Sequence, residues 1–174
     1  PLVMGLDFYR KAVELQQKYA GGKIVHNTLQ TNGTLITPEW ADFFRENDFL
    51  IGISIDGPAD IHDKFRKDKG GQTTFDKVMR GVNLLRQRGV QFNTMTTVNK
   101  ASEGRGAEVY RFLKSIGSRY MQFMPVVEHV MYPVDSQGSI QKKARPYIVS
   151  PETPGAYLAR WSVSSQGFGR FMCD

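Results

Sequence analysis

Two spacings of apolar residues alternate along the chain. Strand-like composition or alternation marks four segments, near residues 24–31, 50–55, 90–98 and 120–124. Apolar residues at helical spacing predict helices over residues 6–19, 38–47, 75–88 and 103–116, and a short helical segment over 60–66. After these, proline and glycine predict a long loop over 131–150 and a last, interrupted helix running from Ser150 toward Phe171.

Capping residues sharpen some of these boundaries. Thr37 is a favourable N-cap and Pro38 a favourable first helical residue, so a helix should begin at residue 38. The pair Gly21-Gly22 should end the first helix, and Gly89 should end the helix that begins at residue 75.

The order of these elements predicts an α/β fold. Four strands, each followed by helical sequence, are typical of a parallel sheet with right-handed crossovers. A doubly wound open sheet has strands that are apolar on both faces, whereas an arc of a barrel can carry a polar inner face. Two of the predicted strands have such a polar face, and we therefore favour the barrel arc. The residues concerned are Thr28, Gln30 and Asn32 on one strand, and Asn93, Met95, Thr97 and Asn99 on another.

The stretch LIGISIDGPADIHDKFR, residues 50–66, carries the same signal most clearly. Side chains alternate along a strand, so its three isoleucines share one face. Gly52, Ser54 and Asp56 share the other face, which is small and polar. That face packs poorly unless a polar ligand lies against it.

A second polar stretch, NTLQTNGTLI, ends the preceding strand. Gln30 and Asn32 lie near its carboxyl end, where parallel α/β folds place their ligands. Their amides can both donate to and accept from a peptide backbone. The alternative for Asn32-Gly33 is a simple turn, because Asn-Gly is a common turn dipeptide.

Composition narrows the class of protein. The chain has 174 residues, 40% of them hydrophobic, and no apolar run long enough to span a bilayer. The net charge of +6 comes from scattered lysines and arginines without interleaved aromatics, so neither nucleic acid nor membrane is expected as a partner. The single cysteine, Cys173, cannot form an internal disulfide, which favours a reducing cytoplasm. His26, His62 and His129 lack metal-ligand spacing, and each is expected to be structural or at the surface.

The segment LQTNGTLITPEWADFFRENDFLIGISIDGPADIHDKFR closely resembles the anaerobic sulfatase-maturating enzymes, a branch of the radical S-adenosylmethionine (SAM) superfamily. The opening PLVM is similar to the end of that family's GGEP-L motif, and YMQFMPVVE to a later barrel strand. The resemblance covers residues 1–128 well and VSPETPGAYLARW more loosely. It implies a partial (β/α)6 barrel and an oxidoreductase that converts a Cys or Ser of a sulfatase to formylglycine.

The resemblance also implies cofactors and partners. SAM and a 4Fe–4S cluster supply a 5′-deoxyadenosyl radical in that family, and two auxiliary clusters in a C-terminal cysteine-rich domain accept electrons. The implied partners are the sulfatase polypeptide and an electron donor such as flavodoxin or ferredoxin.

Carried over residue by residue, the resemblance implies a set of binding residues. Ser54 and Arg66 correspond to SAM contacts, the arginine reaching the methionine carboxylate, and Asp56 lies beside them. Val127, or Val126 if the alignment shifts by one, corresponds to an apolar residue beside the adenine. Gln30 and Asn32 correspond to the family's QTN segment and are the expected substrate-binding residues.

The chain departs from the family in its cysteines. The radical cluster needs a CxxxCxxC run, and Cys173 matches none of those positions. We therefore expect an interior piece of such an enzyme, inactive alone and without metal ligands or catalytic residues of its own. Residues 1–130 would form the central part of the barrel. Residues 131–174 would form a loop and terminal helical segment leading toward the cysteine-rich domain.

Two other interpretations remain open. A related radical SAM maturase could modify a different peptide target. A non-catalytic regulator or binding protein of sulfatase expression is the alternative from another class, although the chain has no helix-turn-helix or other nucleic-acid reader motif.

Overall fold

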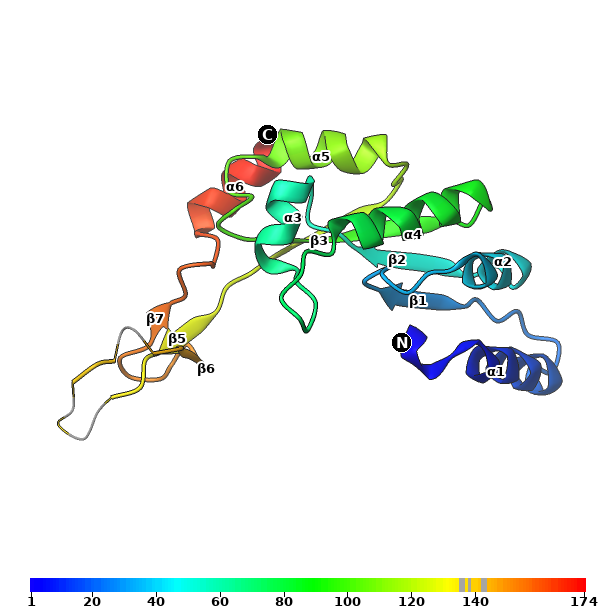
Figure 1. Cartoon of the computed structure of the whole chain (residues 1–174), viewed down its shortest axis with the longest axis horizontal. Coiled ribbons are helices and arrows are strands. Elements are labelled where there is room, and N and C mark those ends of the chain that lie inside the picture. The colour runs from blue at the N-terminus through cyan, green and yellow to red at the C-terminus, as the bar shows by residue number, and fades with distance from the viewer. Residues whose placement is uncertain (135–136, 138, 142–143) are drawn as a thin grey trace. The chain divides into compact units, whose positions relative to one another are not determined.

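The computed structural model describes residues 1–134, 137, 139–141 and 144–174. The helices are a short 3-10 turn, η1 (Leu2–Met4), and the α-helices α1 (Leu6–Tyr19), α2 (Pro38–Glu46), α3 (Ala59–Phe65), α4 (Phe75–Gln87), α5 (Gly106–Ser115) and α6 (Ser165–Cys173). The strands are β1 (Thr28–Thr31), β2 (Leu50–Ser54), β3 (Phe92–Val98), β4 (Met121–Pro125), β5 (His129–Met131), β6 (Tyr147–Val149) and β7 (Tyr157–Leu158) (Figure 1).

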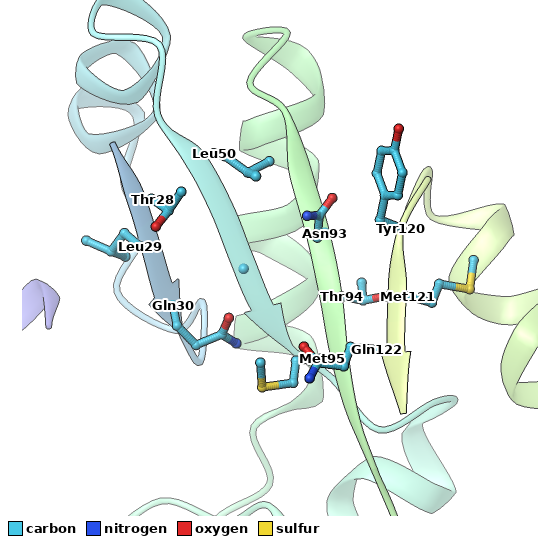
Figure 2. A pocket seen from close by; sticks show the side chains of 11 residues that line it. Thr28, Leu29, Gln30, Leu50, Asn93, Thr94, Met95, Tyr120, Met121 and Gln122 are labelled. Atoms are coloured by element: carbon cyan, nitrogen blue, oxygen red, sulfur yellow. The ribbon is translucent and has the colours of Figure 1, made fainter. Parts of the chain in front are cut away.

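Four strands form the main sheet, in the order β1–β2–β3–β4. β1 pairs with β2 and β2 with β3 in parallel, and Figure 2 shows β4 running in the same direction. Each successive strand is reached through at least one helix, which is the pattern of a parallel α/β sheet. The predicted parallel strands, adjacent in chain order, are therefore confirmed.

The two faces of this sheet differ in burial. Residues alternate between buried and half-buried or exposed along β1, β2 and β3. Ile51 and Ile53 are fully buried on one face, and Phe92 and Val98 of β3 are buried on it as well. Figure 2 shows helical ribbon behind β2 and β3. The opposite face carries the small and polar side chains, as the alternation in residues 50–56 predicts.

Helix ends follow the capping signals. The Thr37 hydroxyl accepts a hydrogen bond from the Trp40 N–H, and α2 begins at Pro38. α4 ends before Gly89, which has a φ of 65°, as its position predicts. α2 contributes an aromatic cluster to the core, formed by Trp40, Phe43 and Phe44 with Phe49.

β1 begins at Thr28, later than the predicted start at residue 24. Asn27 and Gln16 exchange two side-chain hydrogen bonds, of 2.9 and 3.0 Å, which tie this segment to α1. Ile24 and Val25 are exposed, so their β-branched side chains do not belong to the sheet.

The chain forms two compact units. The first comprises Pro1–Thr96 and Ala107–Phe123, and the second Thr97–Gly106 and Met124–Asp174. In the second unit β5 pairs with β6 and β7 in an antiparallel sheet of three short strands. A long loop was expected over residues 131–150, and β6 falls within it; strands this short have no periodic signal. Gly138, part of that predicted loop, lies outside the described residues.

The last helix also begins later than predicted. Residues 150–155 form turns rather than the opening of a helix, and α6 starts at Ser165. The Ser164 hydroxyl accepts from the Gly167 N–H and caps it. Within the part of the chain that the structure describes, no helix combines the length and the apolar composition that crossing a bilayer requires.

Candidate functional site

The polar face of the sheet brings its side chains into one cross-strand row. Gln30 of β1 is in register with Gly52 of β2, which is in register with Asn93 of β3. Two residues further along each strand, toward the carboxyl ends and on the same face, Ser54 is in register with Met95. The expectation that the polar positions of neighbouring strands lie together therefore holds for these residues.

A pocket of about 310 Å³ lies along this face in the first unit. Figure 2 shows the side chains that line it, drawn from all four strands of the sheet. They include the hydroxyl of Thr28, the amides of Gln30 and Asn93, and the thioethers of Met95 and Met121. The lining can therefore hydrogen-bond a polar ligand and also pack against apolar atoms.

Gly52 leaves room for the Gln30 side chain. A Cβ at Gly52 would collide with the Gln30 Oε1 atom. Gln30 reaches from β1 toward β2 across this glycine (Figure 2). Its Nε2 donates a 3.1 Å hydrogen bond to the Ser54 hydroxyl. The small polar face was expected to leave room for a ligand; in the structure the space beside Gly52 holds the Gln30 amide. Gln30 and Ser54 thus form a joined polar pair at the carboxyl ends of β1 and β2.

Asn32 lies in the turn that follows β1. Its Oδ1 accepts from the Thr34 N–H at 3.3 Å and from the Thr34 hydroxyl at 3.0 Å. Gly33 has a φ of 74°, a left-handed conformation that favours glycine. The turn interpretation of Asn32-Gly33 is therefore correct. Both hydrogen bonds to Thr34 use the Asn32 oxygen, so neither uses the Asn32 amide hydrogens. Asn99, predicted on the polar face of β3, is buried beyond the strand, where its Oδ1 accepts from the Ala101 N–H.

Asp56 and Arg66 form a bidentate ion pair. Arg66 Nε lies 2.7 Å from Asp56 Oδ2, and Nη2 lies 3.0 Å from Oδ1. The Asp56 side chain is 2% exposed and that of Arg66 is 28% exposed. β2 ends at Ser54, so Asp56 turns into the protein instead of continuing the polar face. Asp63 and Asp68, the other carboxylates close to Arg66 in the sequence, have different partners: the Thr74 and Phe75 N–H groups for Asp63, and Lys77 for Asp68.

His62 is fully buried beside this pair. Its Nδ1 lies 3.3 Å from the Asp56 N–H and its Nε2 lies 3.1 Å from the Thr74 hydroxyl. Burial is the largest cause that lowers the pKa of His62, with Arg66 adding to it, while Asp56 and Asp63 act in the opposite direction. His62 is therefore a structural histidine, as expected. Thr74 was not singled out from the sequence, because a lone threonine eight to twelve residues after its partners His62, Asp63 and Arg66 leaves no spacing signal.

Val127 belongs to the second unit, between β4 and β5, and is 56% exposed. The N–H of its neighbour Val126 donates to the Val98 carbonyl, and the Val126 carbonyl accepts from the Val163 N–H. The place of Val127 beside an adenine remains a prediction.

A 4Fe–4S cluster does not fit the residues of this chain. Cys173 is the only cysteine in the sequence, and such clusters are held by several thiolates. Among the described residues, moreover, no three His, Cys, Asp or Glu side chains are grouped in a way that could hold a metal.

Comparison with known proteins identifies a family for this chain. The family model described as the Radical SAM superfamily matches residues 3–113. The chain is 44% identical over 173 residues to a serine-type anaerobic sulfatase-maturating enzyme of Bacteroides thetaiotaomicron, covering 99% of this chain and 40% of that relative. It is 36% identical over 159 residues to a cysteine-type enzyme of Clostridium novyi, covering 91% of this chain and 40% of the relative.

Solved structures of similar proteins agree with this family assignment. One described as native anSMEcpe with bound AdoMet and Cp18Cys peptide matches with a TM-score of 0.78 and 31% identity, over 99% of this chain and 42% of the other. The chain thus spans about two fifths of the length of the relatives it matches. The match to the family model, the parallel sheet and these similarities agree with one another: the chain belongs to the Radical SAM superfamily, and within it is similar to the anaerobic sulfatase-maturating enzymes.

Proposed function

We propose that this chain is the SAM- and peptide-binding part of an enzyme that oxidises a Cys or Ser of a sulfatase to formylglycine. The observation that carries the proposal is the 44% identity to a serine-type sulfatase-maturating enzyme, which extends over 99% of the chain. The joined Gln30–Ser54 pair at the carboxyl ends of two parallel strands supports it, because this edge is where parallel α/β folds bind ligands.

The residues of this edge fit the polar part of SAM. We assign cofactor contacts to the Ser54 hydroxyl and to the Arg66 guanidinium, whose partly exposed donors suit the methionine carboxylate. Asp56 belongs to the same group through its pair with Arg66, and Val127 keeps its proposed place beside the adenine. When bound, the cofactor supplies hydrogen-atom abstraction at the β-carbon of the target residue.

We assign the substrate peptide to Gln30 and Asn32. Gln30 lines the pocket, and its Nε2 donates to Ser54, so we assign its carbonyl oxygen as an acceptor for a peptide N–H. Asn32 uses its oxygen in the turn, so it offers amide hydrogens to a peptide carbonyl. Together the two amides provide one acceptor and one donor for an extended backbone.

The oxidation defines what else the complete protein needs. A serine side chain loses two protons and two electrons to become the aldehyde. A cysteine side chain loses the same number, exchanges its sulfur for the oxygen of water and releases hydrogen sulfide. Because this chain offers no cluster ligands, we propose that electrons pass through other parts of the protein and a donor such as flavodoxin or ferredoxin. We place the reaction in the reducing cytoplasm, which cell fractionation tests.

The decisive experiment uses the longest natural protein that contains this chain, purified and reconstituted without oxygen. It is incubated with SAM, a reductant and sulfatase-derived peptides that carry Ser, Cys or Ala at the target position. Mass spectrometry should show formylglycine in the Ser or Cys peptide and none in the Ala peptide. SAM cleavage without formylglycine in any peptide would favour a maturase with another target, and absence of SAM binding would overturn the proposal.

The site assignment is tested separately, by calorimetric titration of SAM. Losing the charged donor in Arg66→Ala should weaken binding about ten- to a hundredfold, whereas Ser54→Ala removes a neutral partner and should cost about two- to tenfold. An unchanged affinity in Arg66→Ala would remove this arginine from the site.

A further inference from the structure

Four residues next to the carboxyl end of β2 form a closed ring of hydrogen bonds through side-chain and backbone groups. The Asp56 N–H points to Nδ1 of His62, and Nε2 of His62 lies beside the Thr74 hydroxyl. The Thr74 hydroxyl donates to the Arg66 carbonyl at 2.9 Å, and the Arg66 guanidinium returns to the Asp56 carboxylate. The ring therefore holds Arg66 at both its backbone and its side chain.

The hydrogens of this ring can be assigned from its own geometry. Thr74 donates its one hydroxyl hydrogen to the Arg66 carbonyl, so it can only accept from His62 Nε2. Nδ1 of His62 accepts from the Asp56 N–H and carries no hydrogen. The imidazole is thus neutral with its hydrogen on Nε2, and each bond of the ring has one donor and one acceptor.

The pair of Asp56 and Arg66 leaves part of the guanidinium available. A guanidinium has five N–H donors, and the two bonds to Asp56 use Nε–H and one Nη2 hydrogen. The other donors lie on the side away from the carboxylate. The bidentate contact fixes the plane of the guanidinium, and with it the direction of these donors.

We propose that Asp56 is a positioning residue, which acts on the carboxylate of SAM only through Arg66. The inference rests on the proposed function and deepens it, since the resemblance placed Asp56 among the cofactor contacts themselves. Its side chain is 2% exposed, so its oxygens face Arg66 and not the polar edge. His62 and Thr74 anchor the arginine backbone from the other side of the ring.

Two effects of Asp56 oppose each other. Its charge offsets that of Arg66 and reduces the pull of the arginine on an anion. Its geometry removes the rotamer freedom of a long side chain before the ligand arrives, which is the entropy that an unordered arginine loses on binding. We take positioning to be the larger effect, because the bidentate contact fixes the plane of the guanidinium before the ligand arrives.

A double-mutant cycle on the cluster-loaded complete protein tests the proposal. Calorimetry with SAM should show about tenfold weaker binding in Asp56→Asn, the loss that corresponds to a charged hydrogen bond. In the Arg66→Ala background the same substitution should have no further effect. Binding of decarboxylated SAM should change little in Asp56→Asn. Asp68→Asn, which breaks a comparable ion pair with Lys77 outside the ring, is the matched control and should bind like the unaltered protein.

A measurement without cofactor tests the ion pair directly. Phenylglyoxal modifies arginine side chains, and mass spectrometry can follow the peptide that contains Arg66. Modification of Arg66 should be slow in the unaltered protein and several times faster in Asp56→Asn, with Asp68→Asn unchanged. Should Asp56→Asn fail to fold, Thr74→Val opens the ring at its far side: it should weaken SAM binding, and Thr74→Ser, which restores the hydroxyl, should recover it.

The outcomes separate the two proposals. If the unaltered protein binds no SAM, the proposed function is wrong. If it binds SAM through Arg66 and the losses from Asp56→Asn and Arg66→Ala add, Asp56 contacts the cofactor itself and the positioning role is overturned. The positioning role is also overturned if Asp56→Asn binds SAM as tightly as the unaltered protein does. If Asp56→Asn does not fold, the same affinity in Thr74→Val overturns it.

Discussion

At the scale of single residues, Gly52 has a role that binding measurements can separate from folding. A Cβ at this position would collide with the far end of the Gln30 side chain, which is flexible, and not with backbone. Gly52→Ala should therefore displace the Gln30 amide and break its hydrogen bond to Ser54. We expect a change in the free energy of unfolding within about 1 kcal/mol, because alanine also restricts the unfolded chain.

The same substitution should weaken SAM and peptide binding several-fold, as calorimetry can measure. Gln30→Ala in the Gly52→Ala background should then add little, since the amide is already displaced. Unaltered binding in Gly52→Ala would show that the position of the Gln30 amide is irrelevant to the ligands.

His62 predicts how stability depends on pH. Burial lowers its pKa from the ordinary value of 6.5, so the folded protein keeps the ring neutral where the unfolded chain already binds a proton. Stability from this group is fully present above about pH 6.5 and falls as the pH drops below it, by at most about 1.4 kcal/mol per pH unit. The fall stops once the pH is below the folded pKa.

Urea denaturation at pH 7.5 and pH 5.5 measures this effect. The loss of stability between the two values should be smaller in His62→Gln than in the unaltered protein, whatever the absolute stability of the variant. His26→Gln, at an exposed position, is the control for removing a histidine. A pH dependence that is identical in His62→Gln and in the unaltered protein would contradict the prediction.

Residue chemistry was predictable where one segment carried the whole signal. The alternation in residues 50–56 correctly placed Ser54 on the polar face, and the Asn-Gly pair correctly indicated a turn. The pairing of Arg66 with Asp56 was not predicted, because Asp56 was expected to share the polar face with Gly52 and Ser54. The chain instead leaves β2 after Ser54, and the carboxylate becomes buried.

At the scale of elements, α4 approaches the turn after β1 through a glycine. A Cβ at Gly81 would collide with the backbone carbonyl of Gly33, which cannot move away as a side chain can. Gly81→Ala should therefore cost about 1–3 kcal/mol of overpacking, and the helix propensity of alanine should recover only up to about 1 kcal/mol of it.

Gly169 in α6 is the matched comparison, because nothing lies within 4 Å of a Cβ placed there. Gly169→Ala should leave the free energy of unfolding unchanged or raise it slightly through helix propensity. Denaturant unfolding of both variants checks the pair. Equal effects of the two substitutions would mean that the close approach of α4 to Gly33 does not limit packing.

Elements with several turns or a cap were predictable, and very short ones were not. α1 has the predicted bounds, 6–19, and α2 begins at its predicted proline after the Thr37 cap. β7 has two residues and β6 three, too few for alternation to appear. The start of α6 was misplaced because Ser150-Pro151 resembles a helix start as closely as Ser164 does, and only the bond from the Gly167 N–H decides between them.

At the scale of the whole molecule, the barrel arc and the superfamily were inferred from the same residues. Polar side chains on successive strands favoured a barrel over an open sheet, and the family model independently matches residues 3–113. The second unit had no such signal, since its three short strands pair across turns and a long connection. Sequence pattern therefore located the candidate ligand edge, while the ring behind it required the fold.

The cysteine content of the chain gives a prediction for the molecule as a unit. Iron–sulfur clusters in this superfamily need at least three thiolates on one cluster, and one chain supplies only Cys173, on exposed α6 surface. Anaerobic reconstitution of the 174-residue chain with iron and sulfide should therefore leave iron and acid-labile sulfide at background. Cys173→Ser, carried through the same procedure, sets that background and should match it. The prediction fails if the unaltered chain takes up stoichiometric iron and sulfide and shows the absorption of a defined cluster. Loss of that uptake in Cys173→Ser would then show that several copies of the chain share their thiolates on one cluster.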